Sequence, residues 1–226
     1  MEKPPYTEIY NILFQNYGSQ GWWPINNIYK KRNSLTNEEK FEIIIGAILT
    51  QNTAWTNVEK ALNELRRNNC LSLKGILETR QETLAMYIKS SGYNNQKAER
   101  LKIVAQFLLQ HPLEELQNME IKELRTLLLS VKGIGPETAD SIILYAFAKP
   151  SFVIDAYTKR IISRIGFCRK DISYDELQTL ITNNIEKDTE LYNEYHALLV
   201  EHAKRYCRIK PECNTCILKD SCEKKL

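Results

Sequence analysis

The sequence predicts an all-α protein, because helix signals recur along the chain and strand signals are scarce. Two capping boxes support this prediction: Thr36 with Glu39 precedes one apolar run, and Ser173 with Glu176 precedes another. No run of alternating apolar residues is bounded by hairpin turns, and no Asn-Gly or Asp-Gly turn occurs. We therefore expect helices joined by short loops.

The expected helices follow one another along the chain, separated by loops marked by NN, SSGYNN, HP and KP. Each has apolar residues at helical spacing, and these apolar faces form core whatever the function. In chain order they cover FEIIIGAIL (41–49), VEKALNELRR (58–67), QKAERLKIVAQFLLQ (96–110), IKELRTLLLS (121–130), PETADSIILYAFA (136–148), LQTLITNNI (177–185) and YNEYHALLVEHAKRYC (192–207).

The chain of 226 residues suits one large domain or two closely packed ones. No apolar run reaches the roughly eighteen residues that a membrane span needs, and the start MEKPPYTEIY lacks the apolar core of a signal peptide. We therefore expect a cytoplasmic protein. The net charge of +3 permits a nucleic-acid partner without indicating one, so that partner has to be argued from where the charges lie.

A glycine hairpin stands between two expected helices in LLLSVKGIGPETAD (127–140). Gly133 and Gly135 permit a tight turn and a close approach to another molecule, and Pro136 suits a first helical turn. The amides at the start of the following helix then offer a site for an anion such as a DNA phosphate. Taken alone, GIG also fits a plain corner between two helices.

Four of the six cysteines crowd into the last twenty residues, with the spacing C-x5-C-x2-C-x5-C. In a chain without an export signal this spacing indicates a metal rather than disulfides, and four thiolates can hold one iron–sulfur cluster or one zinc ion. The predicted ligands are Cys207, Cys213, Cys216 and Cys222. Basic residues surround them, either as a phosphate-contacting face or as a solvated charge run: Lys204, Arg205, Arg208, Lys210 and Lys219.

The pattern L-x-x-K-G-I-G-P-x-T-A-D, continued by V-I-D at 153–155, resembles the helix-hairpin-helix signature of DNA glycosylases of the endonuclease III superfamily. The segment HALLVEHAKRYCRIKPECNTCILKDSC is similar to the carboxy-terminal [4Fe-4S] loop of endonuclease III, although its first gap is five residues where six is commoner. The resemblance therefore favours a [4Fe-4S] cluster over zinc. It also implies that Asp155 is catalytic, a position that equally fits a helix N-cap.

The resemblance extends to two loops that contact DNA in this family. Gln51, in GAILTQNTAW, corresponds to a glutamine that fills the space left by a flipped base, although QNT also fits a polar interhelix loop. SSGYNNQKAERL is similar to the second contact loop, with Asn95 or Lys97 near DNA. The expected DNA-contacting residues are Gln51, Gly92, Lys97, Lys132, Gly133, Gly135, Thr138, Lys204 and Arg205.

GWWP near the start presents an exposed-looking aromatic group, which fits either core packing or a base pocket. Together with LTQNTAW and KGIGPETAD, it resembles the 3-methyladenine glycosylase branch of the superfamily, whose pocket is aromatic. A positively charged alkylated purine gains from the negative faces of such rings. The expected pocket residues are Trp22, Trp23, Pro24, Trp55 and Glu137.

Glu137 stands where bifunctional members of the family carry a lysine that forms a Schiff base and cuts the strand. A carboxylate cannot form that imine, so the resemblance implies a monofunctional enzyme that leaves an abasic site. Asp155 then stabilises the oxocarbenium-like sugar and orients or deprotonates water. Glu137 itself is expected to be a pocket or surface residue, since an acid suits the first turn of a helix.

The family's fold implies two domains: a six-helix domain at 33–149 with the helix-hairpin-helix at 127–148, and a second domain from 1–32 plus 150–226 with the cluster loop at 207–222. The leading hypothesis is a monomeric, monofunctional glycosylase for alkylated purines in double-stranded DNA. One alternative is a mismatch-specific thymine or adenine glycosylase. The other, of a different class, is a non-catalytic DNA-binding module.

Overall fold

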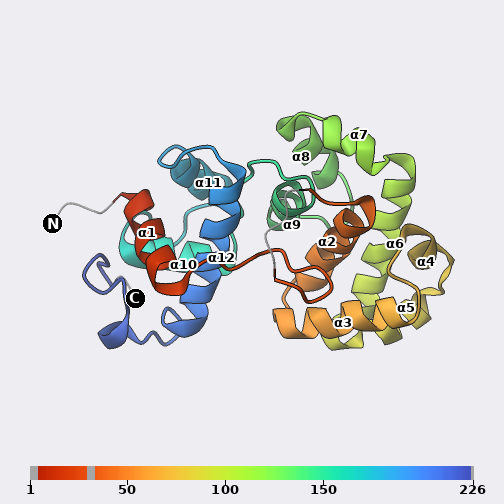
Figure 1. The fold of residues 1–226 in the computed structure, drawn as a ribbon, viewed down its shortest axis with the longest axis horizontal. Coiled ribbons are helices and arrows are strands. Elements are labelled where there is room, and N and C mark those ends of the chain that lie inside the picture. Colours follow the sequence, from red (N-terminus) through yellow and green to blue (C-terminus); the bar gives the residue numbers. More distant parts are fainter. Residues whose placement is uncertain (1–4, 30–33, 225–226) are drawn as a thin grey trace. The chain divides into compact units, whose positions relative to one another are not determined.

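The computed structural model describes residues 5–29 and 34–224, and it is all-α as the sequence predicts (Figure 1). Within these residues, extended pairing is limited to one isolated bridge between Ile25 and Ile28. The chain forms two compact units, one of residues 23–149 and one of residues 1–22 with 150–226. The domain boundary expected between residues 32 and 33 lies outside the described residues.

The unit of residues 23–149 is built around α2, whose residues 41–49 are all buried. Thr36 and Glu39 form the expected capping box at its start. The elements of this unit are α2 (Asn37–Thr50), α3 (Trp55–Arg67), α4 (Leu73–Glu78), α5 (Gln81–Tyr87), the 3-10 turn η1 (Lys89–Ser91), α6 (Asn94–Gln110), α7 (Leu113–Asn118), α8 (Ile121–Leu129), α9 (Pro136–Ser141) and the π-helix η2 (Ile142–Ala146).

The hairpin joins α8 to α9 and has the geometry that its glycines and proline predict. Gly133 has a φ of +95°, in the region that favours glycine, and a Cβ atom there would lie 2.7 Å from Cγ of Arg100. Gly135 has a φ of −98°, and a Cβ atom there would meet nothing within 4 Å. Pro136 occupies the first position of α9, where its missing N–H costs no hydrogen bond.

A buried ion pair ties the two helices of the hairpin together. Arg125 on α8 donates from Nε and Nη2 to the two carboxylate oxygens of Asp140 on α9, at 3.0 and 3.2 Å. The Asp140 side chain is fully buried, whereas that of Arg125 is 24% exposed. A two-pronged pair of this kind fixes orientation as well as distance, so it holds the angle between α8 and α9.

The helix expected over 136–148 changes its hydrogen-bonding pattern after Ser141. The amide of Phe147 donates to the carbonyl of Ile142 at 3.3 Å, five residues back, and all residues of η2 are buried. This wider π-type turn packs against α2. Such a change of register has no signature in the apolar spacing, which is why the sequence predicts a single helix here.

The unit of residues 1–22 and 150–226 is organised by α12, which packs against α1 and α10. Tyr195 on α12 donates its hydroxyl to the carbonyl of Tyr6 at 2.9 Å in the buried interior. Ser173 and Glu176 form the second expected capping box. The elements of this unit are α1 (Tyr6–Tyr17), α10 (Ala156–Ile165), α11 (Tyr174–Thr182), α12 (Thr189–Arg205) and the 3-10 turn η3 (Cys213–Thr215).

Breaking the buried ion pair tests its contribution to stability. For Asp140→Asn we expect the free energy of unfolding to fall by about 3 kcal/mol, because the charge of Arg125 loses its partner in a poorly solvated site. Denaturant titration followed by circular dichroism measures this change. Glu64→Gln is the matched control, since Glu64 pairs with Arg67 on the exposed surface of α3 and should matter little. Equal effects of the two substitutions would contradict the assignment.

The two hairpin glycines should differ in what they tolerate. Gly133→Ala combines a left-handed backbone with a clash against Arg100, so we expect the free energy of unfolding to fall by about 2 kcal/mol. Gly135→Ala should leave stability nearly unchanged, because its backbone is ordinary and the space is open. Thermal unfolding of both variants provides the comparison, and an equal loss at both positions would refute it.

Candidate functional site

Gln51, at the end of α2, is hydrogen-bonded to the hairpin. Its Nε2 donates to the carbonyl of Gly133 at 2.9 Å and to Oγ1 of Thr138 at 3.0 Å. Its Oε1 accepts a hydrogen bond from Nη1 of Arg100. The side chain expected to enter the DNA stack therefore supports the hairpin in the free protein, and Thr138, which is buried, faces Gln51 through its hydroxyl.

Lys97 lies in a different environment from the DNA surface that its sequence position suggested. The residue is 1% exposed, and its Nζ donates to the carbonyls of Leu49 and Ser91 and to Oγ1 of Thr53, each at 2.7 Å. Burial and, to a smaller extent, the nearby charge of Arg100 together lower the pKa of Lys97 to about 8. This ammonium group cannot reach a phosphate, so its role is to join protein segments.

The second contact loop exposes a residue that sequence reasoning missed. Tyr93 follows Gly92 at the start of α6, has a φ of +46° and is 69% exposed. A large aromatic side chain in the left-handed region is unusual, and such strain is often found at functional positions. The signal available in the sequence was an aromatic residue directly after a glycine in a polar loop.

The exposed face of the hairpin carries the remaining predicted residues. Lys132 is exposed and pairs with Glu99 of α6 at 2.7 Å. Gly135 and Glu137 are also exposed, Glu137 in the first turn of α9. Amides in the first turn of an α-helix have no acceptor within the helix, so this end of α9 presents N–H groups beside Lys132.

Two of the predicted pocket aromatics lie together in one unit. The Trp23 ring contacts that of Trp55 edge to face, with centroids 5.0 Å apart, and that of Tyr145 at 5.3 Å. Trp23 and Pro24 are buried, not exposed as GWWP suggested, because Trp23 packs against Gly46 of α2, where a Cβ atom would lie 2.8 Å from the indole. Trp55 is half-buried, and so is Trp22 in the other unit.

Asp155 is the N-cap residue of α10, and its Oδ1 accepts a hydrogen bond from the amide of Thr158 at 2.6 Å. Nε2 of His196, on α12, lies 3.6 Å from Oδ2 of the same carboxylate. The Asp155 side chain is 13% exposed. The structure thus brings to the predicted catalytic acid a histidine that sequence reasoning missed, because nothing in the local spacing connects the two residues.

The carboxyl group of Asp155 is held in its ionised form. Burial alone would raise its pKa, but His196 and the hydrogen bonds from Thr158 outweigh burial, and the pKa lies below the ordinary value of 3.8. Asp155 is therefore a carboxylate at neutral pH and a weak base. It is suited to stabilising a nearby positive charge more than to accepting a proton.

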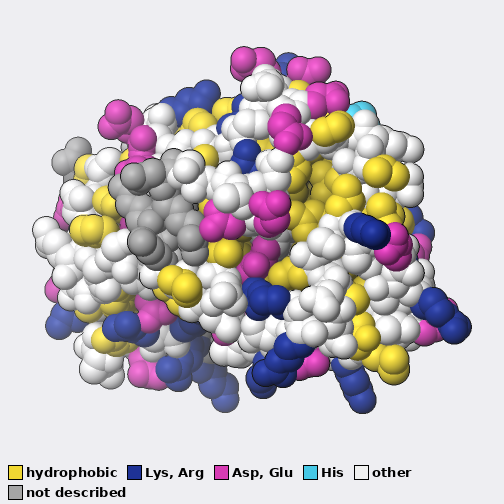
Figure 2. All heavy atoms as spheres, turned by 45° about the vertical axis from the view of Figure 1, so that its right-hand side comes forward, with side chains coloured by type: hydrophobic (Ala, Val, Ile, Leu, Met, Phe, Trp, Pro, Cys, Tyr) yellow, Lys and Arg dark blue, Asp and Glu magenta, His cyan; other side chains and the backbone are white. Residues whose placement is uncertain are grey.

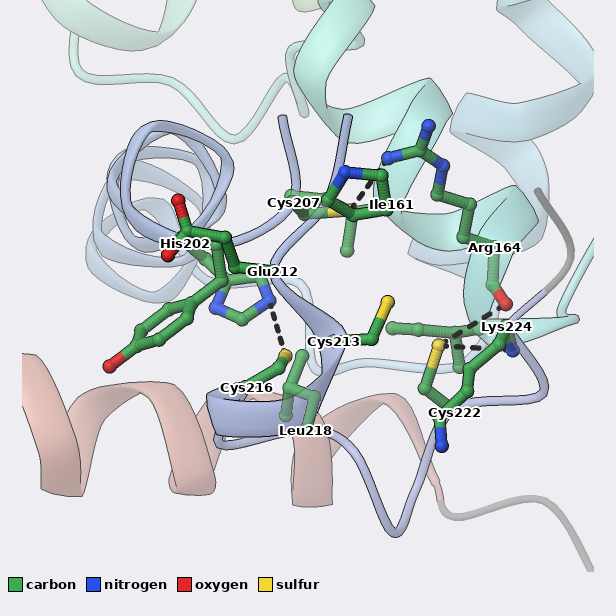
Figure 3. Close-up of a pocket in the computed structure, with 13 residues that line it drawn as sticks. Ile161, Arg164, His202, Cys207, Glu212, Cys213, Cys216, Leu218, Cys222 and Lys224 are labelled. Atoms are coloured by element: carbon green, nitrogen blue, oxygen red, sulfur yellow. Dashed lines mark hydrogen bonds between the residues drawn. The ribbon is translucent and has the colours of Figure 1, made fainter. Parts of the chain in front are cut away.

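The four predicted metal ligands line one pocket, with α10 on one side and the end of α12 on another (Figure 3). All four thiols are free of disulfides. Leu218, Ile161 and Ile165 supply apolar walls. Among residues 5–29 and 34–224, no three His, Cys, Asp or Glu side chains converge closely enough to hold a single metal ion. The cysteines that line this pocket are Cys207, Cys213, Cys216 and Cys222.

Nitrogen atoms lie close to three of the four sulfur atoms of this pocket, those of Cys207, Cys216 and Cys222 (Figure 3). Nη1 of Arg164 lies 3.5 Å from Sγ of Cys207, and Nε2 of His202 lies 3.6 Å from Sγ of Cys216. The backbone amide of Lys224 donates to Sγ of Cys222 at 3.4 Å. Groups that hydrogen-bond to cysteine sulfur stabilise thiolates, which are the form that binds a metal.

Two of the basic residues beside the cysteines, Arg205 and Arg208, form ion pairs with neighbouring glutamates. Arg205 pairs with Glu201 at 2.6 Å, and its guanidinium lies over the ring of Tyr17. Lys204 is exposed.

Figure 2 shows Lys and Arg side chains among Asp and Glu side chains over the face drawn, in agreement with the small net charge. In the part of the chain that the structure describes, no helix is long and apolar enough to cross a bilayer.

Comparison with solved structures shows the same fold. The crystal structure of the Helicobacter pylori 3-methyladenine DNA glycosylase MagIII bound to 1,N6-ethenoadenine matches with a TM-score of 0.71 and 30% identity, over 88% of this chain and 96% of that one. A non-covalent endonuclease III–DNA complex matches with a TM-score of 0.77 over 96% of this chain and 94% of that one, at 21% identity.

Sequence comparison identifies the family. Residues 45–187 match the HhH-GPD superfamily of base excision DNA repair proteins. "Putative DNA repair glycosylase MJ1434" of Methanocaldococcus jannaschii is 43% identical over 95% of this chain and 94% of its own length. Endonuclease III of Sulfolobus acidocaldarius is 29% identical over 81% of each chain. This chain therefore belongs to the HhH-GPD superfamily and is an endonuclease III-like DNA glycosylase of base-excision repair.

Proposed function

We propose that this glycosylase hydrolyses the N-glycosidic bond of alkylated purines, such as 3-methyladenine, flipped out of double-stranded DNA, and that it does so without cutting the strand. The observation that carries the proposal is the ionised carboxylate of Asp155, held by His196 and the Thr158 amide. Such a group complements an oxocarbenium-like sugar. Capping of α10 alone would also keep this carboxylate ionised, so the activity of Asp155→Asn, which preserves the cap, separates the enzymatic reading from the non-catalytic alternative.

Glu137 supports the monofunctional part of the proposal. It occupies the position in the first turn of α9 where bifunctional members of the family carry the Schiff-base lysine. Lys132, on the other side of the hairpin, pairs with Glu99. With no amine at the family's nucleophile position, water is the nucleophile and the product is an abasic site.

Trp55, half-buried beside the buried rings of Trp23 and Tyr145, supports an alkylated purine as the substrate. Ring faces attract a cationic base and stack on it. Such a base is also a good leaving group, which fits a site whose predicted acid is ionised and cannot donate a proton. The 30% identity with the H. pylori 3-methyladenine DNA glycosylase points to the same substrate class.

The hairpin and the two loops beside it would contact DNA. The exposed amides at the start of α9 suit a phosphate, and Gly135 leaves open space for the backbone to approach. Tyr93 offers an exposed ring for stacking on a base, and Gly92 permits its turn. To fill the gap left by the flipped base, Gln51 would exchange its hydrogen bonds to Gly133 and Thr138 for contacts with DNA. Lys132, Lys204 and Arg205 would add charge contacts to phosphates.

The four cysteines fit a [4Fe-4S] cluster. They are free thiols on one largely apolar pocket, and hydrogen-bond donors reach the sulfur atoms of Cys207 and Cys222, as the sulfur ligands of such clusters commonly require. Bound there, the cluster would cross-link the loop that follows α12 within itself, beside the Ile161 and Arg164 side chains of α10. Zinc is the alternative that four thiolates also allow.

The central experiment measures base release from duplexes that carry single defined lesions. We expect release of 3-methyladenine or a related alkylated purine without strand cleavage, and at least about 100-fold slower release by Asp155→Asn in single-turnover assays. Asparagine is itself a good N-cap, so α10 should remain intact and the loss should reflect the missing charge. Asp188→Asn, which alters the N-cap of α12, is the matched control and should retain activity.

The outcomes separate the hypotheses. Full activity of Asp155→Asn, or no release from any lesion by the wild-type protein, would overturn the enzymatic assignment to this site. A covalent DNA complex trapped by borohydride would contradict the monofunctional mechanism. Release of thymine or adenine from mismatches in place of alkylated purines would favour the mismatch-specific alternative.

Iron and sulfide analysis tests the cluster. We expect about four irons and four sulfides per chain and absorption in the visible, both lost when Cys216 is replaced by serine. Cys70→Ser is the control, because Cys70 is buried in the other unit beside Thr79 and should leave the metal content unchanged. A colourless protein with one zinc per chain would establish the alternative.

A further inference from the structure

The ammonium group of Lys97 makes every hydrogen bond available to it. Its three protons match three oxygen atoms at 2.7 Å, the carbonyls of Leu49 and Ser91 and the hydroxyl of Thr53. The Thr53 hydroxyl also lies within hydrogen-bonding distance of the Ser91 carbonyl. Lys97 therefore connects the turn after α2 with the segment that precedes α6.

These two segments carry the residues that would touch DNA. The turn after α2 contains Gln51, whose side chain binds Gly133 of the hairpin. The segment before α6 continues from Ser91 into Gly92 and the exposed Tyr93. A continuous set of hydrogen bonds thus leads from Lys97 to both loops and, through Gln51, to the hairpin.

We propose that Lys97 is a positioning residue for DNA binding, whose buried ammonium group fixes the two contact loops and the hairpin relative to one another. It acts through these loops and does not touch DNA. The inference rests on the proposed function, because it takes the three segments to be the DNA contacts. It replaces the direct phosphate contact expected from the sequence.

The charge of Lys97 is part of this arrangement. A neutral amine has two protons, so it cannot donate to all three oxygens at once, and one of the three hydrogen bonds is lost. The groups that face Nζ from α2 and from η1 are uncharged oxygens, and the neighbouring charge is Arg100 on α6. Since the pKa is about 8, the connection weakens as the pH rises through that value.

The free energy of unfolding should respond to pH in the opposite sense to the DNA affinity. The pKa of Lys97 is about 8 in the folded protein and 10.5 for an ordinary lysine, so the unfolded chain binds more protons between these values. The contribution of Lys97 to the free energy of unfolding therefore rises with pH over this interval. Weaker DNA binding above pH 8 would not be explained by unfolding.

Binding to a duplex with one tetrahydrofuran abasic-site analogue tests the proposal. For Lys97→Met we expect affinity to fall about tenfold or more, and hydrogen exchange in the free protein to become faster at both 50–54 and 91–93. Lys102→Met is the matched control, since Lys102 lies on the same helix and donates to the carbonyl of Leu77, away from these loops. It should bind DNA like the wild type.

Two further readouts exclude other roles for Lys97. The DNA affinity of the wild type should fall between pH 7 and 9. Lys97→Met should lack this fall, and Lys102→Met should show it as the wild type does. The slope of log affinity against log salt should be nearly equal in wild type and Lys97→Met, whereas a lost phosphate contact would reduce it by about 0.9. A reduced slope would mean that Lys97 touches DNA, which would overturn the proposal.

Thr53→Val keeps the inference testable if Lys97→Met does not fold. This variant removes the hydroxyl that contacts both Lys97 and Ser91, and we expect a smaller loss of affinity with faster exchange in the same two segments. If Thr53→Val bound DNA and exchanged hydrogen like the wild type, the inference would be overturned. Base release by the wild type would still support the proposed function in that case. Absence of base release and of lesion binding in the wild type would instead refute the proposed function.

Discussion

The burial of one positive charge is the constraint on which the glycine hairpin and the two loops beside it depend. An ammonium group removed from water needs an oxygen for each of its protons, and Lys97 finds them in two segments that are far apart in sequence. If those segments separated, the ammonium group would lose its oxygen partners while still buried among apolar groups. Because Gln51 lies in one of them and binds Gly133, the same requirement also fixes the hairpin.

Local signals in the sequence predicted local structure well, because the atoms involved lie within one helical turn of each other. The capping box of Thr36 is an example, and so is the turn at Gly133. The distant contacts had no such signal. A lysine in a polar loop looks like a phosphate contact, yet the flexible side chain of Lys97 turns inward. Trp23 looked exposed because its partner, Gly46, is recognisable only once the chain has folded.

In the candidate site, too, the sequence predicted the local features but not the contacts between distant segments. Cysteine spacing and the V-I-D motif identified the residues of interest, since the chemistry of each depends on its own type. The environment of Asp155 could not be predicted, because His196 reaches it from another helix. That environment matters chemically, since it decides whether the carboxyl group is ionised. Asp155 also caps α10, so a single side chain serves both the helix and the proposed chemistry. Asparagine can replace it as the helix cap but not as the negative charge.

The stiffness of α10 has a mechanical consequence. Its ten residues form a rod about 15 Å long. Asp155 lies at one end, while Arg160 in the middle and Arg164 near the other end donate to the carbonyls of Cys207 and Arg208 in the cysteine loop. A stiff helix carries a displacement of one end to the other, so the cysteine loop serves as an anchor for the carboxylate. The position of the Asp155 carboxylate is thereby coupled to the cysteine loop that binds the far end of the same helix.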